Sequence, residues 1–270
     1  MFRYQKYAAT SLVILAGLIT ALAFGPGRGG FRQSGGPTLT LFCAAGVREP
    51  IREVIEKFEV ETGVVVETRY AGSGVLLSSL RLEDADLYLA ADRGYLEQAQ
   101  ERGLTNRIVP FARQHPVIAV QTGNPKQIQS LADLTREKLR VTLPDPERAA
   151  IGRIAKQLLE ETSQWEPIWQ HAMLQRATVN DVANDIKLES ADAGIVWNTT
   201  AAQYWELEPI EIPQFQSAES EIGIAVLKTV QQKELAEQFI SYLLDESIGQ
   251  SIFYNHGYGV INRKPTEVTP

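Results

Sequence analysis

Short apolar runs alternate with amphipathic segments along most of the chain. The runs at 39–44, 64–70 and 86–90 predict buried strands. Between the first two runs, apolar residues recur at helical spacing, and Gly63 follows as an expected helix C-cap. The predicted buried face of that helix comprises Ile51, Val54, Ile55 and Phe58. Strands joined by helices in this order are typical of α/β proteins.

The same alternation continues through the second half of the chain. Apolar runs at 139–143 and 193–197 predict further strands. We expect one helix to start at 144–147 and two helices, 231–244 and 247–254, to close the fold. This order predicts an α/β protein with two lobes, mixed and mostly parallel sheets, and a ligand cleft between the lobes.

The length of 270 residues is sufficient for two modest domains with sizeable cores. Residues 38–116 and 219–262 are expected to form lobe 1, and residues 117–218 are expected to form lobe 2. Residues 263–270 are interpreted as a C-terminal tail.

The N-terminal segment differs from the rest of the chain. Residues 1–7 form a short basic segment, and Ala8–Phe24 is a run of 17 uncharged, mostly apolar residues. This combination is typical of an export signal. Small residues favour cleavage after Ala23, but about 17 residues is also the lower limit for a membrane-spanning helix. We therefore predict a signal peptide or an N-terminal anchor at 1–24, a flexible linker at 25–37, and a periplasmic or otherwise extracytoplasmic body.

Charge is distributed unevenly between that segment and the body. The chain has 26 Lys and Arg against 33 Asp and Glu, and its first acid is Glu49. Four of the bases lie in residues 1–36, so the remainder carries 22 bases against 33 acids, a formal charge of −11. No basic surface is evident that could release counterions from a phosphate backbone, so we expect no nucleic-acid partner. The composition, 44% hydrophobic and 22% charged, is that of an ordinary globular protein.

The reactive residue types show no catalytic or metal-binding spacing. Cys43 is a single cysteine inside a predicted strand, so we interpret it as a small buried apolar residue. The three histidines, His115, His171 and His256, have no partner at metal-ligand spacing. Dinucleotide, nucleoside triphosphate and hydrolase motifs are also absent. We predict no cofactor, no metal-ion ligands and no catalytic activity.

Three turns of small residues follow a predicted strand and precede a predicted helix. They lie at 44–46, 72–74 and 145–152. Such turns expose the unpaired N–H groups of a first helical turn, where the helix dipole also favours negative charge. Ser73 adds a hydroxyl that can donate a hydrogen bond. The turns are therefore candidate anion-binding sites.

These turns belong to a series of strings that resembles the periplasmic molybdate-binding proteins of ABC importers. The strings occur in that family's order and at nearly its spacing: FCAAG at 42–46, YAGSG at 70–74, ADLYLAAD at 85–92, PDPERAAIGRIAK at 144–156, VNDV at 179–182 and DAGIVW at 192–197. The resemblance covers about residues 38–261. It implies a type II periplasmic-binding fold whose two lobes close on a tetrahedral oxyanion by hinge motion.

The resemblance also implies five ligand-binding residues. Ser73 matches the family's second serine, while the first serine falls on Gly46, which keeps an amide but has no hydroxyl. Ile151 and Val182 match residues whose amides donate, and Trp197 stands where the family has a tyrosine. An indole donates through one ring nitrogen, but it is larger than a phenol. The two replacements could each cost roughly 1–3 kcal/mol of binding, the scale of an unmet partner to a charged group.

Arginines near the turns could compensate for these losses. Arg48 follows the first turn, and Arg148 and Arg153 flank the third, although arginines are more often solvated surface residues.

The sequence thus predicts an extracytoplasmic solute-binding protein of an ABC importer. Its expected partners are a small inorganic oxyanion, molybdate or tungstate, and the membrane subunits of a permease, and we expect it to be a monomer. One alternative keeps the fold but changes the ligand to another small anion or to an organic solute stacked on Trp197. Another is a membrane-tethered sensory module, which an uncleaved N-terminal helix would favour. A transcription-regulator domain and an enzyme are disfavoured.

Overall fold

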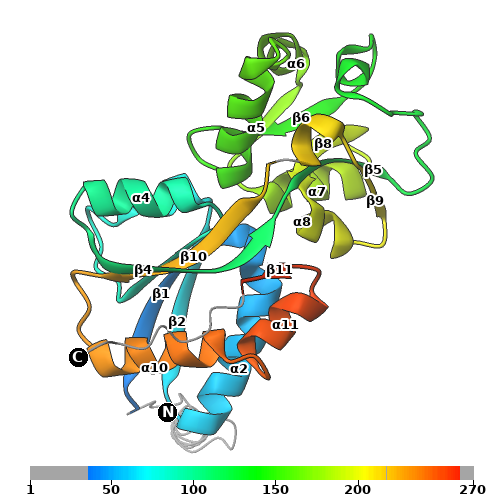
Figure 1. The fold of residues 1–270 in the computed structure, drawn as a ribbon. Helices are drawn as coiled ribbons and strands as arrows, with labels where there is room; N and C mark the ends of the chain where they lie inside the picture. The colour runs from blue at the N-terminus through cyan, green and yellow to red at the C-terminus, as the bar shows by residue number, and fades with distance from the viewer. Residues whose placement is uncertain (1–35, 217, 262–270) are drawn as a thin grey trace, which may run out of the picture. The chain divides into compact units, whose positions relative to one another are not determined.

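The computed structural model describes residues 36–216 and 218–261. The predicted signal or anchor at 1–24, nearly all of the linker and the tail at 263–270 lie outside these ranges. The described residues form two β-sheets, each flanked by helices (Figure 1).

The first sheet has six strands in the order β11-β4-β10-β3-β1-β2. Its strands are β1 (Thr38–Ala44), β2 (Val65–Ala71), β3 (Leu87–Ala90), β4 (Thr105–Gln114), β10 (Ser220–Leu227) and β11 (Gly259–Val260). The helices of this part are η1 (Ala45–Val47), α2 (Arg48–Thr62), α3 (Ser73–Ser79), α4 (Arg93–Glu101), α10 (Lys233–Leu244) and α11 (Gly249–Asn255). We call this sheet with its helices lobe 1.

The second sheet has five strands in the order β7-β6-β8-β5-β9. Its strands are β5 (Pro116–Gln121), β6 (Val141–Pro144), β7 (Leu174–Arg176), β8 (Ala193–Trp197) and β9 (Leu207–Ile210). Its helices are η2 (Leu131–Thr135), α5 (Ala150–Glu161), α6 (Trp165–His171), α7 (Val179–Lys187), α8 (Asn198–Ala202) and α9 (Pro213–Gln216). We call this part lobe 2, and the predicted two-lobed α/β fold is confirmed.

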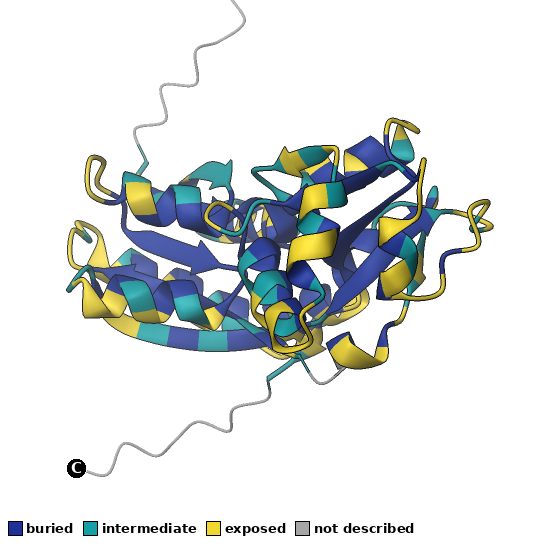
Figure 2. Cartoon of the chain, turned by 90° about the horizontal axis from the view of Figure 1, so that it is seen from above, coloured by how far each residue is buried: buried dark blue, intermediate teal, exposed yellow. Residues whose placement is uncertain are grey.

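The strands of both sheets form the cores, as their apolar sequences predict. Every residue of β3, β6 and β8 is buried, and exposed residues gather on the outer faces of helices and in loops (Figure 2). Helix α2 buries the predicted face, Ile51, Val54, Ile55 and Phe58, together with Pro50. Gly63 ends it in the left-handed conformation, with φ of 72°, which glycine adopts without a steric penalty.

Both sheets are mixed, but the expectation of mostly parallel pairing is too strong. Of the neighbouring strand pairs in the described residues, four are parallel and five antiparallel. The antiparallel pairs involve β4, β5 and β10, the strands at which the chain passes from one sheet to the other. Two strands joined by a helix in one sheet run parallel, whereas a strand connected to the other sheet can pair with its neighbour in the antiparallel direction.

One local expectation is corrected, and one strand was missed. The helix expected to start at 144–147 begins only at Ala150, because residues 145–149 form a turn in which the Arg148 and Ala149 amides donate to the Asp145 carbonyl. Strand β4 was not predicted, because Pro110 interrupts its apolar pattern. A register shift opposite Ile222 and Gly223 accommodates this proline, which has no N–H to donate to the ladder.

Candidate ligand-binding site

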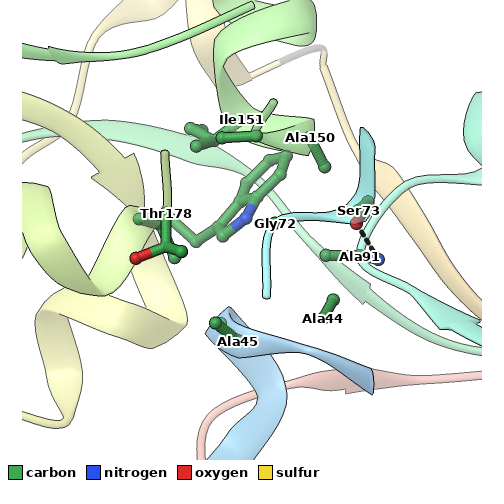
Figure 3. A pocket seen from close by; sticks show the side chains of 12 residues that line it. Ala44, Ala45, Gly72, Ser73, Ala91, Ala150, Ile151 and Thr178 are labelled. Carbon is green, nitrogen blue, oxygen red and sulfur yellow. Dashed lines mark hydrogen bonds between the residues drawn. The ribbon is translucent and has the colours of Figure 1, made fainter. Parts of the chain in front are cut away.

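A small cavity lies where the two lobes meet. Its volume is about 10 Å³, close to the space of one water-sized sphere. Lobe 1 contributes Ala44, Ala45, Gly46, Gly72, Ser73 and Ala91, and lobe 2 contributes Ala149, Ala150, Ile151, Thr178, Val179 and Trp197. None of these described residues carries a charged side chain (Figure 3).

Four helices begin at the wall of this cavity. Helices η1, α3, α5 and α7 start at or directly beside lining residues. Ala44, Gly72 and Ala149, the N-cap residues of the first three, make no side-chain cap. First-turn N–H groups have no acceptor within their own helix, so those without another protein acceptor are available to an anion in the cavity; the Gly74 and Asp181 amides are already used by Arg148 and Thr178.

Helix α7 is capped differently from the other three. The Thr178 hydroxyl accepts a hydrogen bond from the Asp181 amide (3.2 Å) and donates one to the Asp181 carboxylate (2.7 Å). This hydroxyl proton is therefore already used. The α7 start offers the cavity its backbone amides and the Val179 side chain.

Ser73 supplies an oriented hydroxyl. Its side chain is buried, and its Oγ accepts a hydrogen bond from the Ala91 amide (3.2 Å), the dashed line in Figure 3. The Tyr88 hydroxyl donates to the Ser73 carbonyl (2.8 Å), and burial raises the pKa of Tyr88 well above its usual value, so this donor stays protonated. Because the Ser73 oxygen already accepts, its proton is free to donate into the cavity.

Trp197 ends β8 and is 1% exposed. Within the described ranges, no hydrogen bond uses its Nε1–H. The indole edge that carries Cδ1 and Nε1 faces Gly46: a Cβ added there would lie 3.6 Å and 3.9 Å from these two atoms. The Tyr258 hydroxyl donates a hydrogen bond to the Gly46 carbonyl at 3.0 Å.

The lobes also contact each other around the cavity. The Gly74 amide of lobe 1 donates to the Arg148 carbonyl of lobe 2 at 3.1 Å, and the Tyr95 hydroxyl donates to the Pro146 carbonyl at 3.1 Å. Arg153 of α5 forms an ion pair with Asp92, the N-cap of α4. These interlobe bonds define a closed arrangement.

The structure brings together most of the residues that the sequence singles out. Gly46, Ser73, Ile151 and Trp197 all line the cavity. Val182 does not, because it lies one turn inside α7, where its amide donates to the Thr178 carbonyl (3.4 Å). Its side chain packs instead against β8: its Cγ1 is 2.7 Å from where a Cβ of Gly194 would lie.

Several lining residues were missed by the sequence reasoning. Thr178 and Val179 take the place expected for Val182, and Ala91, Ala149 and Ala150 complete the wall. A threonine before an apolar helical pattern is a recognisable N-cap, so the start of α7 was readable from the sequence. Alanines that contribute mainly backbone carry no such signal.

None of the arginines considered as compensating residues lines the cavity. The Arg48 guanidinium lies 4.6 Å from the centre of the Tyr70 ring, and Arg153 is engaged with Asp92. Cys43 is a buried free thiol whose pKa is raised by burial, as expected of an inert apolar residue. Across the described ranges, no group of three or more His, Cys, Asp or Glu residues is placed to hold a metal ion.

The fold has two lobes with a small cavity between them, an arrangement typical of ligand-binding proteins. Residues 39–259 match the family of bacterial extracellular solute-binding proteins, and the chain belongs to that family. The family is one of binding proteins rather than enzymes, and its extracellular character agrees with the predicted export. No helix in the described part of the chain is long and apolar enough to cross a membrane.

Curated relatives match most of the chain. The molybdate-binding protein ModA of Mycobacterium tuberculosis is 28% identical over 92% of this chain and 95% of its own length. A putative binding protein of Haemophilus influenzae is 25% identical over 82% of this chain and 90% of its own.

Solved structures support the fold. The periplasmic molybdate-binding protein of Azotobacter vinelandii superposes with a TM-score of 0.67 at 16% identity, covering 83% of this chain and 100% of that one. The sulfate-binding protein SubI of Mycobacterium tuberculosis gives 0.75 at 18% identity, covering 84% and 88%.

Proposed function

We propose that the protein is the solute-binding component of an ABC importer and holds a fully deprotonated tetrahedral oxyanion, molybdate or tungstate, between its lobes. The observation that carries this proposal is the cavity between the lobes, whose described lining offers N–H and O–H donors but no charged side chain. The similarity to the molybdate-binding protein ModA of Mycobacterium tuberculosis supports the choice of molybdate among oxyanions.

The donor set suits such an anion chemically. Molybdate and tungstate carry no proton at neutral pH, so their oxygens only accept hydrogen bonds. Monohydrogen phosphate would also need an acceptor for its proton, and the lining has no carboxylate. Fixed backbone dipoles in an enclosed cavity would replace the hydration shell that the anion loses.

The proposed donors are backbone amides and two side chains. The amides at Gly46, Ser73 and Ile151 belong to first helical turns, and Val179 takes the role that the sequence assigned to Val182. The Ser73 hydroxyl and the Trp197 Nε1–H are the two side-chain donors among the described lining residues that no protein acceptor uses. Binding through these groups requires no cofactor.

Closure would couple binding to transport. The interlobe bonds at Gly74 and Tyr95 form only when the lobes meet, so an anion that bridges both lobes would favour the closed form. We propose that a membrane permease recognises this form, and that the protein acts as a periplasmic monomer.

The alternative of an organic solute stacked on Trp197 is less favoured. The indole is buried, so little of its ring face is open to a stacked organic ring. A membrane-tethered sensory module stays an alternative. N-terminal sequencing of the mature protein would show whether the predicted signal is cleaved or retained as an anchor.

Isothermal titration calorimetry with molybdate, tungstate, sulfate and phosphate tests the proposal. Molybdate and tungstate should bind with similar affinity, and phosphate should bind weakly or not at all. A flat response to all four anions would refute the oxyanion site. Preferential binding of sulfate would keep the site and change its ligand.

A further inference from the structure

A series of buried hydrogen bonds connects the cavity with the strands that cross between the lobes. Strand β4 leads directly into β5 of lobe 2, and β10 follows α9 of lobe 2 (Figure 1). Gln114 is the last residue of β4, Ser220 is the first residue of β10, and the two pair in register. Both residues are buried. The crossover region therefore contains two polar side chains that must find their hydrogen-bond partners within the protein.

Both side chains reach Ala91, which lines the cavity. The Gln114 Nε2 donates to the Ala91 carbonyl at 3.1 Å. The Ser220 hydroxyl lies 3.2 Å from the same carbonyl oxygen and 3.0 Å from the Asp92 carboxylate, and it has one proton for these two acceptors. Gln114 is therefore the donor that the Ala91 carbonyl keeps in either arrangement of the Ser220 proton.

Ala91 connects Gln114 with the proposed ligand site. The Ala91 amide donates to the Ser73 Oγ at 3.2 Å, and this bond leaves the Ser73 proton free to donate into the cavity. The amide and the carbonyl of Ala91 flank the same Cα in buried backbone, so a shift of the carbonyl also shifts the amide. The orientation of the Ser73 hydroxyl thus depends on the bond that Gln114 makes.

The oxygen of the Gln114 carboxamide is bound by lobe 2. The Thr199 hydroxyl donates to the Gln114 Oε1 at 2.9 Å, and Thr199 is fully buried. Thr199 lies in the first turn of α8, whose N-cap residue, Trp197, lines the cavity. Because the Ala91 carbonyl can only accept, the amide nitrogen of Gln114 faces Ala91 and its oxygen faces Thr199. Both bonds together require a side chain that has a donor and an acceptor, as glutamine has.

We propose that Gln114 is a positioning residue for the oxyanion site, whose carboxamide ties the Ala91 backbone that orients Ser73 to Thr199 of lobe 2. The inference rests on the proposed oxyanion function and adds to it a residue that lies outside the cavity lining. It predicts that a change at Gln114 alters the affinity for the anion through the Ser73 hydroxyl and through the link to lobe 2.

Double-mutant cycles with molybdate as the calorimetric ligand test the proposal. Gln114→Met nearly keeps the length of the side chain but removes the amide, and it should weaken molybdate binding about ten-fold. Its effect should be coupled to that of Ser73→Ala, so the double variant should bind at least about five-fold more tightly than the product of the two single effects predicts. Additive effects would overturn the proposal, because Gln114 would then not act through Ser73.

Thr199→Val tests the link from lobe 2. It removes the donor to Gln114 and nearly keeps the side-chain volume. It should weaken molybdate binding about five-fold alone, and by less than about two-fold in a Gln114→Met background. Wild-type affinity in Thr199→Val, or an equal effect in both backgrounds, would overturn the link. The single variant decides this point even if Gln114→Met does not fold.

Gln114→Glu separates positioning from filling of space. An ionised glutamate keeps the acceptor but cannot donate to the Ala91 carbonyl, whereas the protonated form regains an O–H donor. Burial should raise the pKa of this carboxyl. Molybdate affinity of Gln114→Glu should therefore rise at least about five-fold from about pH 8 to about pH 5.5 relative to wild type, which controls for other titrating groups such as His115 and Asp92. The same pH dependence in both proteins would overturn the donor role.

A matched control guards against loss of stability as the explanation. Gln250 of α11 is also a buried glutamine of lobe 1, but it does not line the cavity. Gln250→Met should bind molybdate with wild-type affinity, and circular dichroism should show that all variants are folded at the temperature of the titration. A loss of affinity in Gln250→Met equal to that in Gln114→Met would overturn the specific role of Gln114. Failure of the wild type to bind any oxyanion would instead refute the proposed function, so the two failures are distinguishable.

Discussion

Replacing Gly72 with alanine should prevent the lobes from closing. Gly72 has φ of −63° and ψ of 146°, which alanine adopts freely, so the substitution causes no local backbone strain. An added Cβ would nevertheless lie 2.2 Å from the Arg148 carbonyl oxygen and 2.4 Å from the Ala177 carbonyl oxygen, both in lobe 2. Because these are backbone atoms, relief requires that the two lobes move apart.

The size of the effect follows from that displacement. Real Cβ contacts essentially never fall below 3.0 Å, so the Arg148 oxygen must retreat by at least 0.8 Å, the difference between 3.0 and 2.2 Å. A similar shift would stretch the Gly74–Arg148 hydrogen bond from 3.1 Å beyond the usual range. If the amides of Ile151 and Val179 move with lobe 2, two hydrogen bonds to the anion are lost at about 1.5–3 kcal/mol each. A loss of about 3–6 kcal/mol corresponds to at least a hundred-fold weaker binding.

Calorimetry with molybdate measures the affinity, and small-angle scattering with and without molybdate measures closure. Gly259→Ala is the matched control, because its Cβ would have no contact closer than 3.5 Å. We expect Gly72→Ala to have the wild-type circular dichroism spectrum, weak molybdate binding and no ligand-induced compaction. A folded Gly72→Ala protein that binds molybdate as tightly as wild type would refute the steric reasoning.

Four further predictions follow from the same structure. Ser73→Ala removes a cavity donor and the acceptor of the Ala91 amide, so molybdate binding measured by calorimetry should weaken about ten-fold or more. Arg153→Met breaks the interlobe ion pair and leaves the buried Asp92 carboxylate without its guanidinium, so molybdate affinity should fall although Arg153 does not line the cavity. Because no charged side chain lines the cavity, the molybdate dissociation constant should change little between low and high sodium chloride concentration. Burial raises the pKa of Asp192, but hydrogen bonds and charge from Arg140 outweigh burial and lower that pKa below 3.8. The ionised Asp192 therefore stabilises the fold above its usual pKa, and this contribution is lost as pH falls through the lowered pKa. Urea titrations of wild type and Asp192→Asn should converge at acid pH.

The elements of the fold that the sequence predicted well are those governed by local pattern. The apolar spacing of α2 and the glycine that ends it are both local properties, and they agree with the structure. Strand β4 depends on pairing with β10, which lies more than a hundred residues away in sequence, and on a register shift that admits Pro110. A pattern that is read along one strand contains no information about such a partner.

The candidate site was predictable to the extent that side chains define it. Ser73 and Trp197 stand out in the sequence because a hydroxyl and an indole have recognisable chemistry. The choice between Val179 and Val182 depends on where α7 begins, since only first-turn amides are free of helical acceptors. The contact of Gly72 with the Arg148 carbonyl arises only when the lobes close, so no spacing within either lobe reveals it.

The acidic character of the body limits how the proposed anion can be held. Residues from 37 onward carry a formal charge of −11, so the overall field opposes the approach of a dianion. Arg48 lies on the Tyr70 ring, Arg153 pairs with Asp92, and neither these two arginines nor Arg148 lines the cavity, so no arginine side chain contributes a positive charge to its wall. Attraction must then come from amide dipoles at short range, which are effective only where water is excluded and the local dielectric is low. Closure of the lobes is thus a condition of binding as well as its consequence, because the same contacts that exclude water bring the lobe 2 amides into range.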